Sequence, residues 1–476
     1  MVSGDKAVVV LCLGVLLLAL GGCDDGATSD PPKIYTFESR SGDGSSVSYS
    51  GQVLRQVLIV DLVTHIAGLT ARIDNEGFFP EQGDVLEELD FYYAFDSQSS
   101  GDRPLYISTE PSTLQHVYGD IATDKDLQGK IAGNDPEGQH KDFRTQFRGW
   151  DEAGVSSPDS LVHRWFEQLE ALARERANGN AGTDPDGEPL KHVHVTEKGL
   201  DLQQLIQKFL GVAVCFSQGV DDYLDNDVPD GGINSDHTEL EEGEPYTELE
   251  HAWDEAYGYF GAARDYTQYS DEEIAGSGGR DSHRNGYSDS NDDGHIDLTS
   301  EYNFGHSTNA AKRDLGAEGS IDFTQEAFDA LLRGRHVLAH ATGALNEAEK
   351  GSLVAERDII VSVWEKIIAA TVVHYINEVL IDMKTFGTAG YDFYAHAKHW
   401  SEMKGFALGF QFSPRSPLSD AEFLELHHYL GQAPVLPGQE GVTAYEDGLR
   451  ISRAVLVQAY NFDPANEGGV DGQGGW

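Results

Sequence analysis

The segment SLVAERDIIVSVWEKIIAATVVHYINEVLIDMK, residues 352–384, decides the fold class of this chain. Its apolar residues recur close to every 3.6 positions, and Ile360, Trp364, Ile367 and Thr371 share one stripe. This spacing places their side chains on one face of an α-helix. The sequence therefore predicts one long helix over residues 352–384, around which other helices can pack.

Shorter segments with helical periodicity occur on both sides of this one. They cover residues 51–69, 160–177, 198–223, 246–260, 325–341, 392–412, 419–429 and 444–460. Strand signals are sparse, and Ser419 followed by Glu422 is typical of a capped helix start. We therefore predict an all-α fold, a large helical bundle-type domain. Its long acidic loops are expected at residues 178–189, 225–244 and 265–289.

The N-terminus has the features of a bacterial lipoprotein signal peptide. Residues 1–22 contain an apolar run from Ala7 to Leu20, which is too short to span a bilayer and suits a cleaved leader. Small residues then precede Cys23, so we expect Cys23 to become the lipid-carrying, palmitoylated first residue of the mature chain. This predicts anchoring in the bacterial cell envelope, facing the periplasm or the outer surface. No later segment reaches 18 consecutive apolar residues.

The expected organisation of the chain follows from these boundaries. Residues 23–34 form a tether, residues 35–461 the helical domain, and the glycine-rich residues 462–476 a disordered tail. After removal of the leader and lipidation of Cys23, Cys215 is the only remaining cysteine, so an intramolecular disulfide is excluded.

The charge balance limits the classes of partner. The chain has 33 basic and 81 acidic residues, a formal net charge of −48. Nucleic acid is therefore excluded as a partner, because phosphate backbones require a basic surface. The same charge attracts divalent cations.

One loop has the spacing of a calcium site. The sequence DSNDDGHIDLTSE, residues 289–301, places oxygen ligands at the alternate positions of an EF-hand-type loop around Gly294. The predicted ligands are Asp289, Asn291, Asp293, the backbone carbonyl of His295, Asp297 and Glu301. The last carboxylate arrives one residue late, and the flanks do not predict two long helices. We therefore expect a solitary calcium-stabilised loop; the alternative is an acidic, solvated loop.

Three predicted helices each carry histidine and glutamate on one face. The pairs are His251 with Glu255, His374 with Glu378, and His399 with Glu402. Histidine and glutamate that face the interior of a helical bundle can bind iron or zinc. The alternative is that each buried histidine hydrogen-bonds a glutamate without any metal. The sequence does not decide whether the three pairs lie together.

Several separated motifs together resemble a bacterial lipoprotein family of unknown function, domain of unknown function 4856. They are KIAGND (130–135), FRGW (147–150), TEKGLDLQQL (196–205), EHAWDEAYGYFG (250–261), NFGHSTNAAKRD (303–314) and VWEKIIAATVVHYINE (363–378). That family is similar in context to imelysin-associated envelope proteins. The resemblance implies an envelope location and partners in metal uptake, and it carries no catalytic residue.

Three functions remain open at this point. The first is a non-enzymatic, lipid-anchored envelope protein that binds calcium and assists the acquisition of iron or another metal. The second is a metal-dependent hydrolase that uses the helix histidines to activate water. The third is a structural surface protein in which calcium only makes a loop rigid.

Overall fold

Thirteen α-helices make up the computed structural model of this protein, which describes residues 30–42, 44–98, 103–135 and 138–476. The predicted leader and Cys23 lie outside the described residues. The helices are α1 (Ser50–Asn75), α2 (Asp84–Tyr93), α3 (Phe143–Gln146), α4 (Pro158–Ala177), α5 (Leu202–Leu210), α6 (Glu248–Phe260), α7 (Asp271–Ile274), α8 (Gly305–Gly316), α9 (Phe323–His340), α10 (Glu347–Lys384), α11 (Phe393–Ala407), α12 (Asp420–Leu430) and α13 (Val442–Ala459). Isolated β-bridges occur in the described chain, but no strand does. The predicted all-α fold is confirmed.

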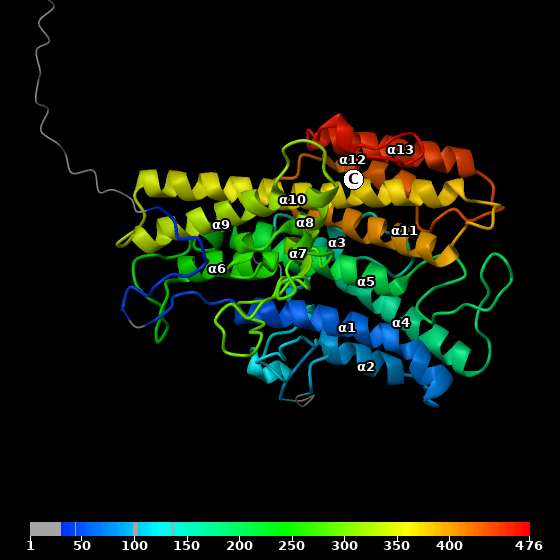
Figure 1. The fold of residues 1–476 in the computed structure, drawn as a ribbon, viewed down its shortest axis with the longest axis horizontal. Coiled ribbons are helices and arrows are strands. Elements are labelled where there is room, and N and C mark those ends of the chain that lie inside the picture. The colour runs from blue at the N-terminus through cyan, green and yellow to red at the C-terminus, as the bar shows by residue number, and fades with distance from the viewer. Residues whose placement is uncertain (1–29, 43, 99–102, 136–137) are drawn as a thin grey trace, which may run out of the picture. The chain divides into compact units, whose positions relative to one another are not determined.

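The longest helix, α10, packs against four other helices. It begins after Asn346, whose side chain accepts hydrogen bonds from the backbone N–H groups of Ala348 and Glu349. It contacts α8, α9, α11 and α13, and Figure 1 shows α9 and α11 running beside it. Trp364, at the middle of its apolar stripe, is fully buried. The predicted helix is confirmed, with about one further turn at its start.

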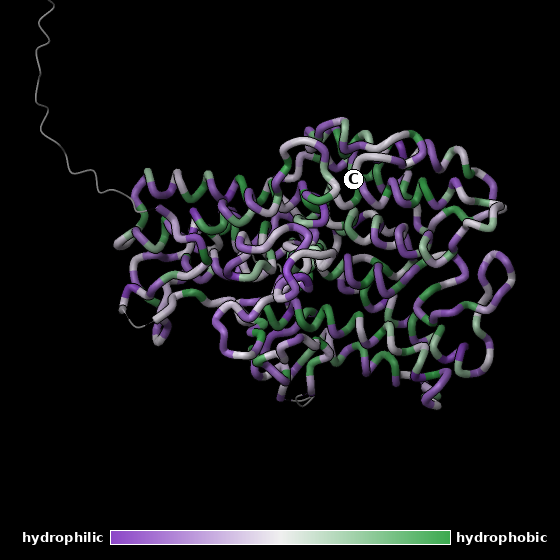
Figure 2. Tube along the Cα trace, viewed as in Figure 1, coloured by the Kyte–Doolittle hydropathy of each residue, from purple (hydrophilic) through white to green (hydrophobic). Residues whose placement is uncertain are grey.

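Two helices, α1 and α10, are long and apolar enough to cross a membrane by length and composition. In each, 72% of the apolar window is buried inside the protein. Apolar positions recur along both helices, whereas the loops carry mostly hydrophilic residues (Figure 2). Such burial is what a core helix of a globular protein shows.

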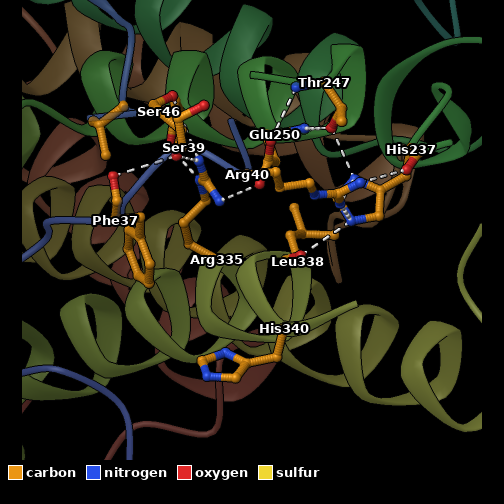
Figure 3. Close-up of polar contacts among 12 residues, drawn as sticks. Phe37, Ser39, Arg40, Ser46, His237, Thr247, Glu250, Arg335, Leu338 and His340 are labelled. Carbon is orange, nitrogen blue, oxygen red and sulfur yellow. Dashed lines mark hydrogen bonds and ion pairs between the residues drawn. The ribbon is translucent and has the colours of Figure 1, made fainter. Parts of the chain in front are cut away.

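A buried ionic network fixes the N-terminal segment to the bundle. Arg335 of α9 is fully buried and forms ion pairs with Glu250 and Asp254 of α6, at 3.0 and 2.9 Å. Its second Nη atom donates to the hydroxyl of Ser46 at 2.7 Å. Figure 3 shows this guanidinium between the N-terminal segment and α6. Because removal of either partner would leave a buried charge unpaired, the network holds the start of the domain in one position.

Some of the helices were not predicted from the sequence, and the prediction for the C-terminal tail is incorrect. Helices α2 and α8 had not been predicted. The predicted helix over residues 198–223 begins after Asp201 and continues beyond α5 as π-helical turns at Gly211–Phe216 and Gly219–Tyr223. The prediction of a disordered tail at residues 462–476 is wrong, because Trp476 is buried and its indole N–H donates to the carbonyl of Arg313 at 3.0 Å.

Candidate functional site

The acidic loop, residues 289–301, is organised around its own backbone. The carboxylate of Asp289 accepts hydrogen bonds from the N–H groups of Asp293 and Gly294, at 3.0 and 2.9 Å. The side-chain oxygen of Asn291 accepts a second bond from Asp293 N–H at 2.9 Å. These contacts bring Asp289, Asn291 and Asp293 to one tight turn, with Gly294 at a φ of 87°. Three of the predicted calcium ligands therefore lie together.

Glu301 closes the acidic loop from the inside. Its side chain is buried, and its Oε1 accepts bonds from Ser290 N–H, Ser290 Oγ and Asn291 N–H. Its Oε2 accepts from the N–H of Asp297 at 2.9 Å. The displaced carboxylate that broke the calcium pattern thus joins the two ends of the loop.

Asp297 is turned out of the loop toward a neighbouring segment. Its Oδ1 accepts hydrogen bonds from Gln115 Nε2 and Thr299 N–H, at 2.7 and 2.9 Å. Ile296 beside it is fully buried, and its carbonyl accepts from Leu114 N–H. The predicted ligand at position 9 therefore attaches the loop to residues 112–115.

The pair His251 and Glu255 lies apart from the other histidines, on α6. His251 Nδ1 is 3.1 Å from the carbonyl of Ser48, and its ring stacks on Tyr246. Glu255 accepts a 2.7 Å hydrogen bond from Gln52. Each side chain therefore has another partner within the protein, and His251 Nε2 lies 3.8 Å from Glu255.

The other two pairs do meet, across α10 and α11. His399 Nδ1 lies 2.8 Å from Asp382 and 3.9 Å from Glu378. Burial lowers the pKa of His399, but the hydrogen bond that it donates to Asp382 and the charges of the nearby carboxylates together outweigh burial and raise that pKa above its usual value. For His374, burial and then the charge of Arg313 lower the pKa to about 3.

Cationic side chains surround these two pairs. Lys208 of α5 lies 3.3 Å from Glu402. Lys312 and Arg313 of α8 are also near Glu402, since its charge shifts the pKa of both. A metal cation at Glu402 would be repelled by three positive charges. Within the described part of the chain, no three His, Cys, Asp or Glu side chains are grouped so that they could hold a metal ion.

A recess of about 230 Å³ opens beside the same lysines, and we call it the α8 recess. It lies between α1, α5, α11 and the start of α8. Its lining residues are Gln56, Ile59, Val60, Gln207, Lys208, Gly211, Tyr302, Asn303, Phe304, Gly305, His306, Thr308, Asn309, Lys312 and Phe406. Its walls thus combine apolar and uncharged polar groups, with two lysines and no carboxylate.

The π-helical turn after α5 shapes one wall of the α8 recess. His306 Nε2 donates to the carbonyl of Gly211, the first residue of that turn, at 2.9 Å. Burial lowers the pKa of His306 to about 4, so its ring is neutral near pH 7. π-helical turns inside α-helices are frequent at functional sites.

The recess residues were not predicted as a site from the sequence. Lys208 and Lys312 stand 104 positions apart, and only the fold brings them together. One local signal was present: the motif NFGHSTNAAKRD opens a helix with no acidic residue in its first turn, although the chain is strongly acidic.

Comparison with known proteins matches one part of the chain. Residues 120–291 match the family described as Domain of unknown function (DUF4856). No curated protein and no solved structure matches. The matched residues include α4, α5, the π-helical turns, α6, and the beginning of the acidic loop. The predicted resemblance to this domain of unknown function is therefore supported over residues 120–291, whereas its lipoprotein and imelysin-related parts stay predictions.

Proposed function

We propose that this protein is a non-enzymatic, lipid-anchored protein of the bacterial cell envelope that binds calcium at the acidic loop. The anchor is proposed from the sequence around Cys23, and a contribution to metal acquisition from the family resemblance. The observation that carries the calcium proposal is the gathering of Asp289, Asn291 and Asp293 at one turn.

The chemistry of these groups suits calcium. Carboxylate and amide oxygens, a backbone carbonyl and water are the ligands that calcium takes in flexible geometry. Because Glu301 already bonds three backbone N–H groups, the proposed ligands are Asp289, Asn291, Asp293 and the carbonyl of His295, completed by water. The formal charge of −48 concentrates divalent cations near the surface.

A transition-metal role has less support than calcium. The lysines and Arg313 around Glu402 oppose a cation there, and His251 and Glu255 are bonded to other groups. A hydrolase would need an open metal position on such histidines. We therefore propose calcium as the ligand of this protein. Iron or zinc would be bound by its proposed partners in metal acquisition.

Calcium should stabilise the folded chain by mass action. At a free calcium concentration 100-fold above Kd, the free energy of unfolding should rise by about 2.7 kcal/mol. The measurement is calorimetric unfolding of the mature chain in calcium and in chelator. The variant Asn291→Ala with Asp293→Ala should lose the difference between the two conditions.

The matched control is Asp292→Asn. Asp292 lies in the same loop at a φ of 58°, but at position 4, which supplies no ligand. Asparagine tolerates this left-handed backbone and removes the same charge, so the calcium response should persist. A wild-type melting curve identical in calcium and chelator would refute the calcium proposal.

A further inference from the structure

The α8 recess differs in charge from the rest of the molecule. Of the 476 residues 81 are acidic, so 15 lining residues would include two or three carboxylates on average, yet these include none. Three other recesses in the described chain each include at least one, for example Asp230, Glu365 and Glu175. The absence of acid coincides with the presence of Lys208 and Lys312, which favours an anionic ligand.

Charged and polar hydrogen-bond donors line the α8 recess. Lys208 of α5 and Lys312 of α8 supply ammonium groups, and Lys208 also donates to Gln207 at 2.7 Å. Asn309 and Thr308 add an amide and a hydroxyl. A small oxygen-rich anion can accept several such bonds at once, and bonds to charged donors are the stronger ones.

The backbone of α8 adds further donors. Helix α8 has twelve residues and begins at Gly305, which lines the recess. Phe304 precedes it and provides no side-chain cap, and the first turn has no acidic residue. Uncapped N–H groups and the helix dipole both favour an anion at this end.

A buried polar atom on the same wall gives an independent indication. His306 is 2% exposed, and its Nε2 donates a hydrogen bond to the carbonyl of Gly211. Its Nδ1 has no hydrogen-bond partner among the described residues. Because Nε2 carries the ring proton, Nδ1 is an acceptor, and buried acceptors are usually paired with a donor. A protonated oxyanion, which both donates and accepts, meets this need.

We propose that the α8 recess binds a small phosphate-type oxyanion, either free phosphate or the phosphate group of a monoester. This site is separate from the proposed calcium loop. Lysine binds phosphate as a point charge, and a recess of about 230 Å³ is large enough for a phosphate group with a short attached chain.

Nearby carboxylates limit the affinity but do not cancel the site. Lys208 forms an ion pair with Glu402 at 3.3 Å, and Glu378 also lies in this region. Lys312, Arg313 and Lys398 add positive charge on the same side. Burial and then the charge of Lys208 lower the pKa of Lys312, and a bound dianion would reverse this effect by stabilising the ammonium form.

Calorimetric titration of the mature chain at fixed ionic strength tests the proposal. The probes are inorganic phosphate and glycerol phosphate, with acetate as a monocarboxylate comparison. We expect saturable binding of about one phosphate per chain, and tighter binding of one of the two phosphates identifies the source. Lys312→Met should weaken it at least about tenfold, as expected for loss of a charge-assisted bond.

Two variants separate contact from general electrostatics. Lys350→Met removes the same charge from an exposed position of α10 outside the recess and should change the affinity less than about twofold. Asn309→Asp puts a carboxylate into the lining without a change of size and should abolish binding, while circular dichroism stays unchanged. Equal phosphate affinity in wild type, Lys312→Met and Asn309→Asp would overturn the proposal, as would no saturable binding to wild type.

Discussion

The acidic loop, residues 289–301, is followed directly by Tyr302, the first of five consecutive residues that line the α8 recess, yet the two regions carry opposite charge. The loop collects carboxylates at an exposed turn and holds them with backbone N–H groups. The recess collects lysines from two helices and includes no carboxylate. A site built within one continuous segment can be recognised from its spacing, whereas a site built between helices depends on tertiary packing.

Asn303 and Phe304, which follow the loop and line the recess, are hydrogen-bonded to the chain at the end of α6. Asn303 Oδ1 accepts a hydrogen bond from Ala263 N–H, and its Nδ2 donates to Gly286, at 2.8 and 2.9 Å. The N–H of Phe304 donates to the carbonyl of Gly261 at 2.7 Å. The two regions are therefore anchored to one frame, and variants in each can be compared in the same background.

The largest expected effect is the loss of Glu301 from the acidic loop. Glu301→Ala removes the acceptor of three backbone N–H groups and one hydroxyl. Because hydrogen bonds to charged groups are worth about 1.5–3 kcal/mol each and are not additive, we expect a loss of at least about 3 kcal/mol in the free energy of unfolding. Denaturant unfolding in chelator measures it.

Glu301→Gln is the matched control, since it keeps the size and one acceptor oxygen. It should retain part of the stability lost in the alanine variant. Asp293→Ala, at an exposed position, should change stability little in chelator. If Glu301→Ala were no more destabilising than Asp293→Ala, the loop would not depend on its buried carboxylate.

A smaller effect is expected from His306 in the α8 recess, through pH. Its pKa is lowered to about 4 by burial, against about 6.5 in an unfolded chain. As pH falls from 6.5 to 4, the unfolded state takes up the proton first, so this residue's contribution to stability is lost in that window. At 1.36 kcal/mol per unit, the loss approaches 3 kcal/mol.

His306→Gln should remove this part of the acid sensitivity, because a glutamine has no such proton to gain and can still donate to Gly211. Unfolding of both proteins at pH 7 and pH 4 measures the difference. His116→Gln, at an exposed position, serves as the control and should follow wild type. Parallel pH dependence of wild type and His306→Gln would contradict a neutral, buried ring.

The sequence predicted the helices whose apolar stripes are long. Residues 352–384 and 51–69 carry such stripes, and α10 and α1 cover both. Helix α8 was missed because GHSTNAAKRDLG has few large apolar residues. Its place is fixed by tertiary contacts, such as those with α10 and α9. The tail was predicted incorrectly because its glycines suggested disorder, while Phe462, Asn466 and Trp476 are buried against the helices.

In the candidate site, as in the fold, only features within one continuous segment could be predicted from the sequence. Spacing alone found Asp289, Asn291 and Asp293, because these positions belong to one turn. It could not show that Asp297 turns toward Gln115. It also identified His374 and His399 without their cationic neighbours, which come from α5 and α8. Pairing across helices is set by the packing of the bundle, and periodicity in one helix carries no information on it.

The smallest effect, and the one that compares the two regions most directly, is the response to salt. A charge of −48 attracts calcium and repels phosphate at distances beyond about 10 Å, the screening length near 0.1 M salt. Raising sodium chloride from about 10 to 150 mM removes most of this long-range term and leaves the contacts inside each site. Calcium affinity should therefore fall severalfold, while phosphate affinity should hold or rise up to about twofold. Titrations of wild type with calcium and with phosphate at both salt concentrations measure how each affinity depends on salt. A phosphate affinity that falls as steeply as the calcium affinity would mean that phosphate is held by exposed lysines in solvent and not within the α8 recess.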